Sequence, residues 1–170
     1  AGWVQAEAQP GAIPLVAAGQ CADIVFSAMD FKIVSIAATN LAEDISRVTG
    51  FKPTIRMQPA SNGTPVVLIG TLGHCPLLDR MEREGKMDVS KLRGQWESFV
   101  ITTVSNPLPG VSQALVIAGS DRRGTAFGVF NLVCGIALLV ASVLAGWLWD
   151  AFGPGFTFYA GAALTLVAWI

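Results

Sequence analysis

The chain of 170 residues is poor in the side chains on which metal sites and many catalytic sites depend. It holds one histidine, one tyrosine and three cysteines. The histidine, His74, is followed directly by Cys75, and neighbouring side chains rarely bind one metal ion together. A zinc site needs more nitrogen and sulfur ligands than this region offers. The sequence therefore predicts neither a metal nor a cofactor.

The cysteines also lack the spacing of a disulfide framework or a redox motif. The chain has no CxxC motif, and Cys134 stands in an apolar run. The pair Cys21–Cys75 stays open as a bridge. A nucleophile pair of Cys75 with His74 stays open as well, because it depends on closeness in space and on an orienting group.

Phosphate-binding motifs and an excess of one charge are absent too. The segment "GTLGHC" (70–75) has two glycines but lacks GxGxxG and the Lys-Ser/Thr of a P-loop. We interpret it as a tight turn between a strand and a helix rather than as a phosphate cradle. The formal net charge is −1, which indicates no nucleic-acid partner.

Charge is almost missing from the C-terminal quarter, where Asp150 is the one charged residue after Arg123. The uncharged stretch of about 26 residues reaches ~39 Å as a helix, which exceeds the ~30 Å hydrocarbon core of a bilayer. We therefore predict a membrane span at about 126–149 and a lipid bilayer as partner. Trp147 and Trp149 suit an interfacial aromatic belt.

A breaker at 150–155 separates this span from a second apolar run, 156–170. That run of about 15 residues reaches only ~22 Å, too short to cross. We expect a membrane-associated helical hairpin over 128–170 whose second span is incomplete. Small residues at Ala137, Ala141 and Ala145 favour close packing against another helix.

Between residues 13 and 127 the pattern is that of an α/β domain. The apolar runs 66–70 and 114–119 are typical of strands buried on both faces of a sheet. Strands that alternate with helices predict a mixed sheet, with antiparallel pairing where only a short turn intervenes. Further strands are expected at 13–16, 23–27, 52–56 and 96–104.

Two helices are expected within this domain. Asp30 is the expected N-cap of the first and Gly50 its expected C′ residue. A shorter amphipathic helix is expected at 77–85. The first helix carries apolar residues at spacings of four and three, namely Val34, Ala38, Leu41, Ile45 and Val48.

Two acids, Glu97 and Asp121, stand at the edges of predicted strands. Glycoside hydrolysis needs two carboxylates roughly 5–10 Å apart, but nothing separates these two from solvated or salt-bridged acids. Ser120 or Asp121 is a suitable cap for the next helix. Arg122 and Arg123 are interpreted as charges beside the span, able to contact phosphate or lipid head groups without specificity. We therefore predict no catalytic residue.

The N-terminal segment 1–12 contains Ala6-Glu7-Ala8, a pattern of small residues like a secretory cleavage site. We interpret this segment either as the remnant of a signal peptide or as a disordered terminus. In both interpretations the chain is expected to be cut at its start.

The motifs "RGQWESF", "NPLPGV" and "ALVIAGSDRRGT" occur in this order between residues 93 and 125. With them, residues 13 to about 130 resemble the N-terminal domain of glycoside hydrolase family 115, the xylan α-glucuronidases. The resemblance implies a secreted or periplasmic enzyme that removes glucuronic or 4-O-methylglucuronic acid from glucuronoxylan. It also implies that this α/β domain is accessory and that the catalytic residues lie in a following barrel. We therefore expect no activity from this chain.

The segments "RGTAFG" and "GWLWDAFGP" lie within 123–170, which resembles the last two helices of a major facilitator superfamily transporter. The resemblance implies a carrier, which needs about a dozen spans. We interpret the chain as a chimera joined near Arg123–Asn131, with no function of its own. Two arginines would keep the domain cytoplasmic while a signal peptide would export it. The alternative is a transporter fragment with a foreign N-terminal extension.

Overall fold

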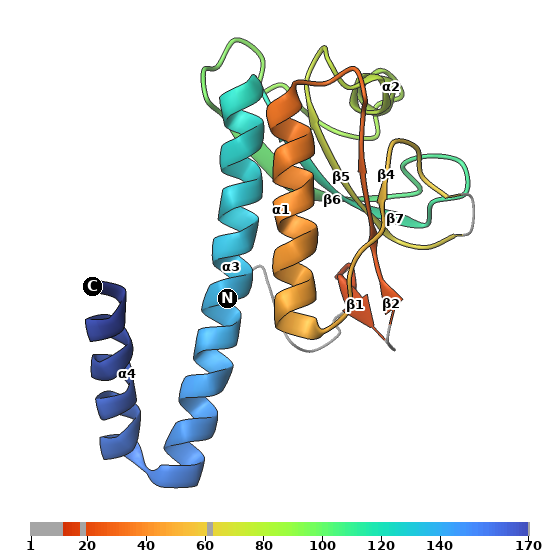
Figure 1. Ribbon diagram of the computed structural model, residues 1–170. Helices are drawn as coiled ribbons and strands as arrows, with labels where there is room; N and C mark the ends of the chain where they lie inside the picture. The colour runs from red at the N-terminus through yellow and green to blue at the C-terminus, as the bar shows by residue number, and fades with distance from the viewer. Residues whose placement is uncertain (1–11, 18–19, 61–62, 170) are drawn as a thin grey trace. The chain divides into compact units, whose positions relative to one another are not determined.

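The computed structural model describes residues 12–17, 20–60 and 63–169 (Figure 1). Contacts divide the chain into two compact units between Val133 and Cys134. We call the described residues up to Val133 the α/β unit and those from Cys134 the helical unit. Segment 1–11, which includes the expected signal remnant, lies outside the described residues.

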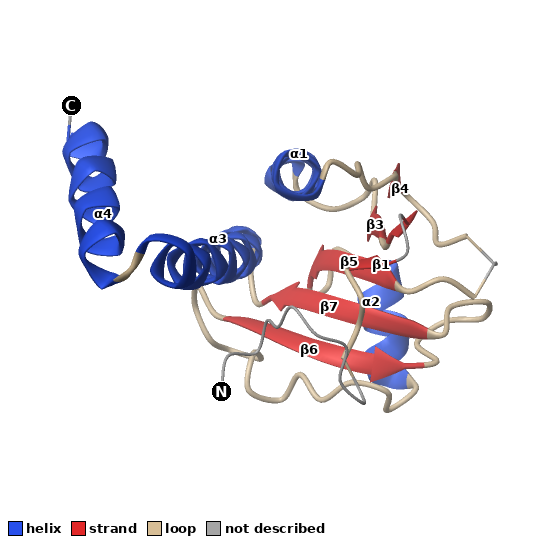
Figure 2. Ribbon diagram, turned by 90° about the horizontal axis from the view of Figure 1, so that it is seen from below, coloured by secondary structure: helices blue, strands red, loops and turns tan. Residues whose placement is uncertain are grey.

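The α/β unit is built on a five-stranded sheet in the order β4-β3-β5-β7-β6 (Figure 2). Four strands run parallel, and β6 pairs with β7 in the antiparallel direction at one edge. A separate antiparallel pair joins β1 to β2. The strands are β1 (Val16–Ala17), β2 (Gln20–Cys21), β3 (Asp23–Phe26), β4 (Ile55–Arg56), β5 (Val66–Thr71), β6 (Phe99–Ser105) and β7 (Gln113–Gly119).

Helices cover both faces of this sheet. Helix α1 (Lys32–Thr49) and the first turns of α3 (Arg122–Phe152) lie over one face, and α2 (Pro76–Arg83) lies over the other (Figure 2). All six residues of β5 are buried. Its even-numbered residues Val66 and Leu68 pack in one cluster with Leu78 of α2. This two-sided burial explains the uninterrupted apolar runs of β5 and β7 and confirms both predicted strands.

Helix α1 follows its predicted apolar face over most of its length. Four of the five expected residues are buried, and Ala42 joins them, but Val48 is 46% exposed. Gly50 ends the helix at a φ of 77°, as expected for a C-terminal glycine. The expected N-cap was wrong. Phe31 takes that position, because the Asp30 carboxylate accepts hydrogen bonds from the N–H groups of Phe31 (2.8 Å) and Thr71 (2.7 Å).

Three predicted strands have different bounds in the structure. The strand predicted at 13–16 was wrong except for its last residue, because β1 covers Val16–Ala17. The segment expected as a turn after Val16 contains β2. The strand predicted at 52–56 shortens to β4. The strand predicted at 96–104 begins three residues later, at Phe99, because Glu97 has a φ of 53°. A left-handed residue cannot continue a strand. The helix expected at 77–85 is α2.

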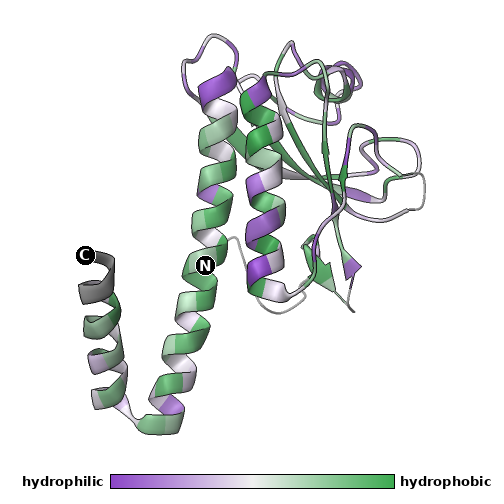
Figure 3. Cartoon of the chain, viewed as in Figure 1, coloured by the Kyte–Doolittle hydropathy of each residue, from purple (hydrophilic) through white to green (hydrophobic). Residues whose placement is uncertain are grey.

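The helical unit contains the rest of α3 and α4 (Pro154–Trp169), with Gly153 between them at a φ of 82°. Hydrophobic residues predominate along both helices (Figure 3). Among the described helices, α3 is the one long and apolar enough to cross a membrane, with a mean hydropathy of 2.4 over its most apolar window. Helix α4 has 16 residues, so a hairpin of two spans remains a prediction.

Candidate functional site

The carboxyl edge of the parallel strands is the first place to look for a site. Helix α1 follows β3 on one face and α2 follows β5 on the other. The strand order therefore changes direction between β3 and β5. In open α/β sheets, ligands bind outside the carboxyl ends of the strands at such a switch point.

This crevice is closed by side chains of the protein itself. Asp30, which follows β3, binds the N–H of Thr71 at the end of β5 with its Oδ2 atom, at 2.7 Å. The ring of Phe31 lies against that of His74, with centroids 4.2 Å apart and planes tilted by 47°. The switch point is thus used to join the two loops.

The loop at 71–75 likewise has no free backbone donor. Leu72 donates to the carbonyl of Gly119 (3.0 Å), and Gly73 donates to Oδ1 of Asp79 (2.9 Å). The N–H groups of His74 and Cys75 both bind the carbonyl of Thr71, at 3.1 and 3.0 Å. Because an anion cradle needs outward N–H groups, the loop is a turn, as the sequence indicates.

Cys75 is a buried core residue and not a nucleophile. Burial raises the pKa of its thiol to about 11, against the opposing effect of the Leu78 N–H group. A reactive cysteine needs a lowered pKa, and His74 instead stacks on Phe31. The pair left open in the sequence is therefore not formed. The bridge Cys21–Cys75, also left open in the sequence, is not formed in the structure, where all three cysteines are free thiols.

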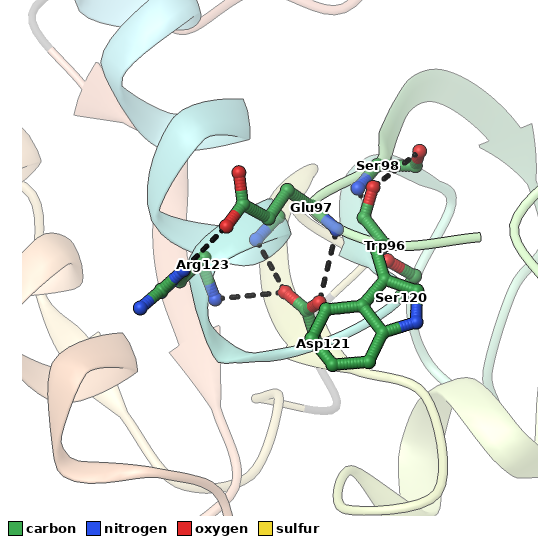
Figure 4. A network of polar contacts seen from close by, with 7 residues as sticks. Trp96, Glu97, Ser98, Ser120, Asp121 and Arg123 are labelled. Carbon is green, nitrogen blue, oxygen red and sulfur yellow. Dashed lines mark hydrogen bonds and ion pairs between the residues drawn. The ribbon is translucent and has the colours of Figure 1, made fainter.

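Asp121 caps the N-terminus of α3. Its Oδ1 atom accepts hydrogen bonds from the N–H groups of Arg123 (2.9 Å) and Gly124 (2.8 Å), and its Oδ2 atom from that of Glu97 (2.9 Å) (Figure 4). These N–H donors, Gly124 first, hold the pKa of Asp121 below its usual range. A carboxylate with three backbone donors serves the fold.

Glu97 belongs to the same polar network. Its Oε1 atom lies 2.5 Å from Nη1 of Arg123. Beside it, the N–H of Ser120 donates to the carbonyl of Ser98 (2.8 Å), and Oγ of Ser120 accepts from the Ser98 N–H (3.1 Å). The two candidate acids are therefore joined to each other through backbone and an arginine, and neither faces a cleft as a free carboxylate.

Trp96 is the residue whose place the sequence reasoning missed. It was predicted inside a strand, but it lies in the loop before β6 with 85% of its surface exposed. The nearby Gly94, at a φ of 74°, is the local sign that the chain turns there. The polar network on its C-terminal side fixes the loop that carries it.

Hollows occur on the described part of the α/β unit, and in two of them the charges are largely paired. The first, of about 460 Å³, is lined by Asp79, Glu82 and Arg93 among others, and Glu82 binds Arg93 at 2.6 Å. The second, of about 450 Å³, is lined by Arg80 and Lys86. Both cations bind Glu84, at 2.6 and 2.8 Å. The hydrogen bond from Arg80 is the main cause that lowers the pKa of Glu84 to about 2.

Metal-ligating side chains do not gather anywhere in the described part of the chain. There, no group of three or more His, Cys, Asp and Glu side chains could hold an ion. The arrangement at the carboxyl edge thus offers hydrogen bonds that position loops and the start of α3.

Comparison with known proteins supports the fold of the α/β unit. Among the solved structures that match is one described as a family 115 4-O-methyl-α-glucuronidase with specificity for decorated arabinogalactans, with a TM-score of 0.51 and 23% identity. The match covers 66% of this chain and 13% of that enzyme. No protein-family model and no curated protein sequence matches the chain.

At this identity the likeness shows a shared fold. The α/β unit therefore has a fold that also occurs within a much longer glycoside hydrolase. None of the comparisons supports the expected likeness of the helical unit to transporters.

Proposed function

We propose that the α/β unit is a non-catalytic domain of an α-glucuronidase-like glycoside hydrolase. The observation that supports this proposal is that the motifs behind the resemblance contact each other and hold the fold together. Within "ALVIAGSDRRGT", Asp121 caps α3. A Cβ atom on Gly124 would lie 2.2 Å from the carbonyl oxygen of Ser98 in "RGQWESF". These motifs interlock with each other.

Thr125 completes this interlocking. Its buried hydroxyl lies 2.8 Å from that of Thr71, so it links the start of α3 to the end of β5. Gly119 allows the approach, since a Cβ atom there would lie 2.2 Å from the Thr125 nitrogen. Residues that make such internal contacts stabilise the fold rather than bind a substrate. This supports an accessory role beside a catalytic domain.

The substrate class and the compartment follow from the same proposal. The parent enzyme would act on glucuronoxylan and would be secreted or periplasmic. To test the catalytic part, the full chain is incubated with aldouronic xylo-oligosaccharides and the release of glucuronic or 4-O-methylglucuronic acid is measured. We expect no release. Steady turnover above a heat-denatured control would overturn the non-catalytic role.

For the helical unit we propose association with a lipid bilayer, in second place. The favouring observation is α3, whose most apolar window is only 17% buried. In a flotation gradient, the full chain should rise with phosphatidylcholine vesicles and resist carbonate extraction. Recovery in the aqueous fraction as a monodisperse protein would contradict this proposal.

The transporter alternative and the chimera remain proposals. Sequencing of the source DNA tests whether the fusion is genuine. Helix α3 runs without a break through Arg123–Asn131, where we place the junction of two coding sequences. A single long sequencing read of the source DNA through codons 119–140 would support a genuine fusion. Reads that stop on either side would support an artefact of assembly.

A further inference from the structure

The first turns of α3 belong to the α/β unit, although their composition resembles that of a membrane span. Thr125, Val129 and Leu132 are buried there, with exposed fractions of 4% or less. A Cβ atom on Gly128 would lie 2.7 Å from Cγ2 of Ile117 in β7 and 3.3 Å from Phe99 in β6. This close approach leaves no room for lipid on that side of the helix.

From Cys134 to Phe152 the same helix has no buried residue. Its large apolar side chains are exposed or half-buried, and the exposed ones include Leu138, Leu144 and Trp147 at 68%, 54% and 58%. A helix that is apolar all round belongs in a protein core or in a membrane. Within the helical unit, the described residues provide no such core.

We infer that the bilayer-embedded part of α3 begins at Cys134 and ends at Phe152. This inference rests on the bilayer association proposed above. The 19 residues of this segment rise ~28 Å, which matches the ~30 Å hydrocarbon core. The span expected at 126–149 would place in lipid a segment that packs on the sheet. With the later start, Trp147 and Trp149 lie in the last two turns, where an aromatic belt is expected.

The shifted start also changes the role of the arginines. Arg123 precedes Cys134 by 11 residues, or ~16 Å of helix. Headgroup layers extend only ~5–8 Å beyond the hydrocarbon on each side. Arg123, moreover, is paired with Glu97 at 2.5 Å. Neither Arg122 nor Arg123 is therefore a lipid headgroup ligand.

Two exposed positions on either side of the inferred boundary provide the test. Phe130 and Leu138 have similar exposed fractions, 62% and 68%, so cysteine is tolerated at both. Phe130→Cys and Leu138→Cys are made in the full chain with Cys21→Ser and Cys134→Ala. Cys75 stays as a buried, unreactive thiol. Each variant is added to preformed phosphatidylcholine vesicles containing one fifth phosphatidylglycerol, floated, and treated with a membrane-impermeant maleimide.

We expect Phe130→Cys to be labelled as fast as in detergent and Leu138→Cys to be labelled at least tenfold more slowly until detergent is added. Protection of both sites would overturn the boundary while leaving bilayer association intact. Full labelling of both would overturn bilayer association itself. Protection of Leu138→Cys in buffer without vesicles would show that a second copy of the chain covers the helix, which also overturns the inference.

The arginine part of the inference has an independent measurement. Replacing the exposed Arg122 by alanine should change binding to vesicles with and without phosphatidylglycerol by less than twofold. A selective loss of several-fold on the anionic vesicles would show that this arginine contacts headgroups.

Discussion

Helix α3 passes through two surroundings, and the glycines of the two units show the difference between them. In the α/β unit, Gly124 and Gly128 have neighbours so near that a Cβ atom would overlap them. In the helical unit, Gly146, Gly155 and Gly161 have nothing within 4 Å of such an atom. The same residue type therefore permits close packing in the first unit and has no protein neighbour in the second.

The contrast extends to other side chains. Leu68, Thr125 and Asp121 of the α/β unit pack against or bond to other elements of that unit, whereas Leu138, Ser142 and Asp150 of the helical unit are exposed. The comparison predicts that matched substitutions destabilise the first unit and leave the second unchanged. The free energy of unfolding of the full chain in mild detergent can measure both.

Loss of a core leucine should have the largest effect. Leu68 of β5 is fully buried and packs in the cluster that contains Leu78. Leu68→Ala removes buried methyl groups and leaves a cavity, which costs about 2–5 kcal/mol. Leu138→Ala, at a position that is 68% exposed, should change the urea midpoint only slightly. Equal losses would mean that the helical unit has a packed protein core.

A smaller but still substantial loss is expected from adding one methyl group at Gly124. Its Cβ atom would meet the carbonyl oxygen of Ser98, the residue before β6, at 2.2 Å, so this loop or α3 must shift. We expect Gly124→Ala to cost about 1–3 kcal/mol, read as a lower melting temperature. Gly146→Ala, in open space, should be neutral or slightly stabilising, because alanine favours a helix by up to about 1 kcal/mol. A melting temperature unchanged by Gly124→Ala would mean that α3 does not pack on β6.

The sequence predicts those features that depend on local composition. The strands β5 and β7 follow from apolar runs, since burial on both faces requires apolar residues at every position. Most of α1 follows from the spacing of Val34, Ala38 and Leu41. Gly50 is predicted correctly because the end of a helix is decided by local backbone conformation.

Features that depend on distant contacts could not be predicted. Asp30 was expected to cap α1, but a hydrogen bond to Thr71, 41 positions away, engages it. Hydropathy alone does not show that the first turns of α3 pack on the sheet, because the close approach of Gly128 to Ile117 is invisible in composition. At the candidate site, Glu97 and Asp121 were noted only as acids at the edges of predicted strands, and their bonds to Arg123 and to backbone N–H groups come from the fold.

Removing one buried hydroxyl should lower the free energy of unfolding by an intermediate amount. Thr71 and Thr125 are 1% and 0% exposed, and their hydroxyl oxygens lie 2.8 Å apart. Thr125→Val leaves the Thr71 hydroxyl without this partner, which costs about 1–3 kcal/mol, whereas Thr125→Ser keeps it. Ser142→Ala removes an exposed hydroxyl bonded to the Leu138 carbonyl and should have no measurable effect. A neutral Thr125→Val, measured by urea unfolding, would show that the hydroxyl pair does not stabilise the fold.

The smallest loss of folding stability is expected from replacing an acidic residue, and the size of this loss depends on pH. Asp121→Ala removes the cap of α3 and should cost about 1 kcal/mol at pH 7. Because the backbone donors lower the pKa of Asp121 in the folded chain, its carboxylate stabilises the fold above the unfolded pKa of about 3.9. This contribution is lost as the pH falls through the lower folded pKa. The difference in stability between Asp121→Ala and the parent should therefore shrink below pH 4. A difference that stays constant down to pH 2 would show that Asp121 acts through its shape rather than through its charge.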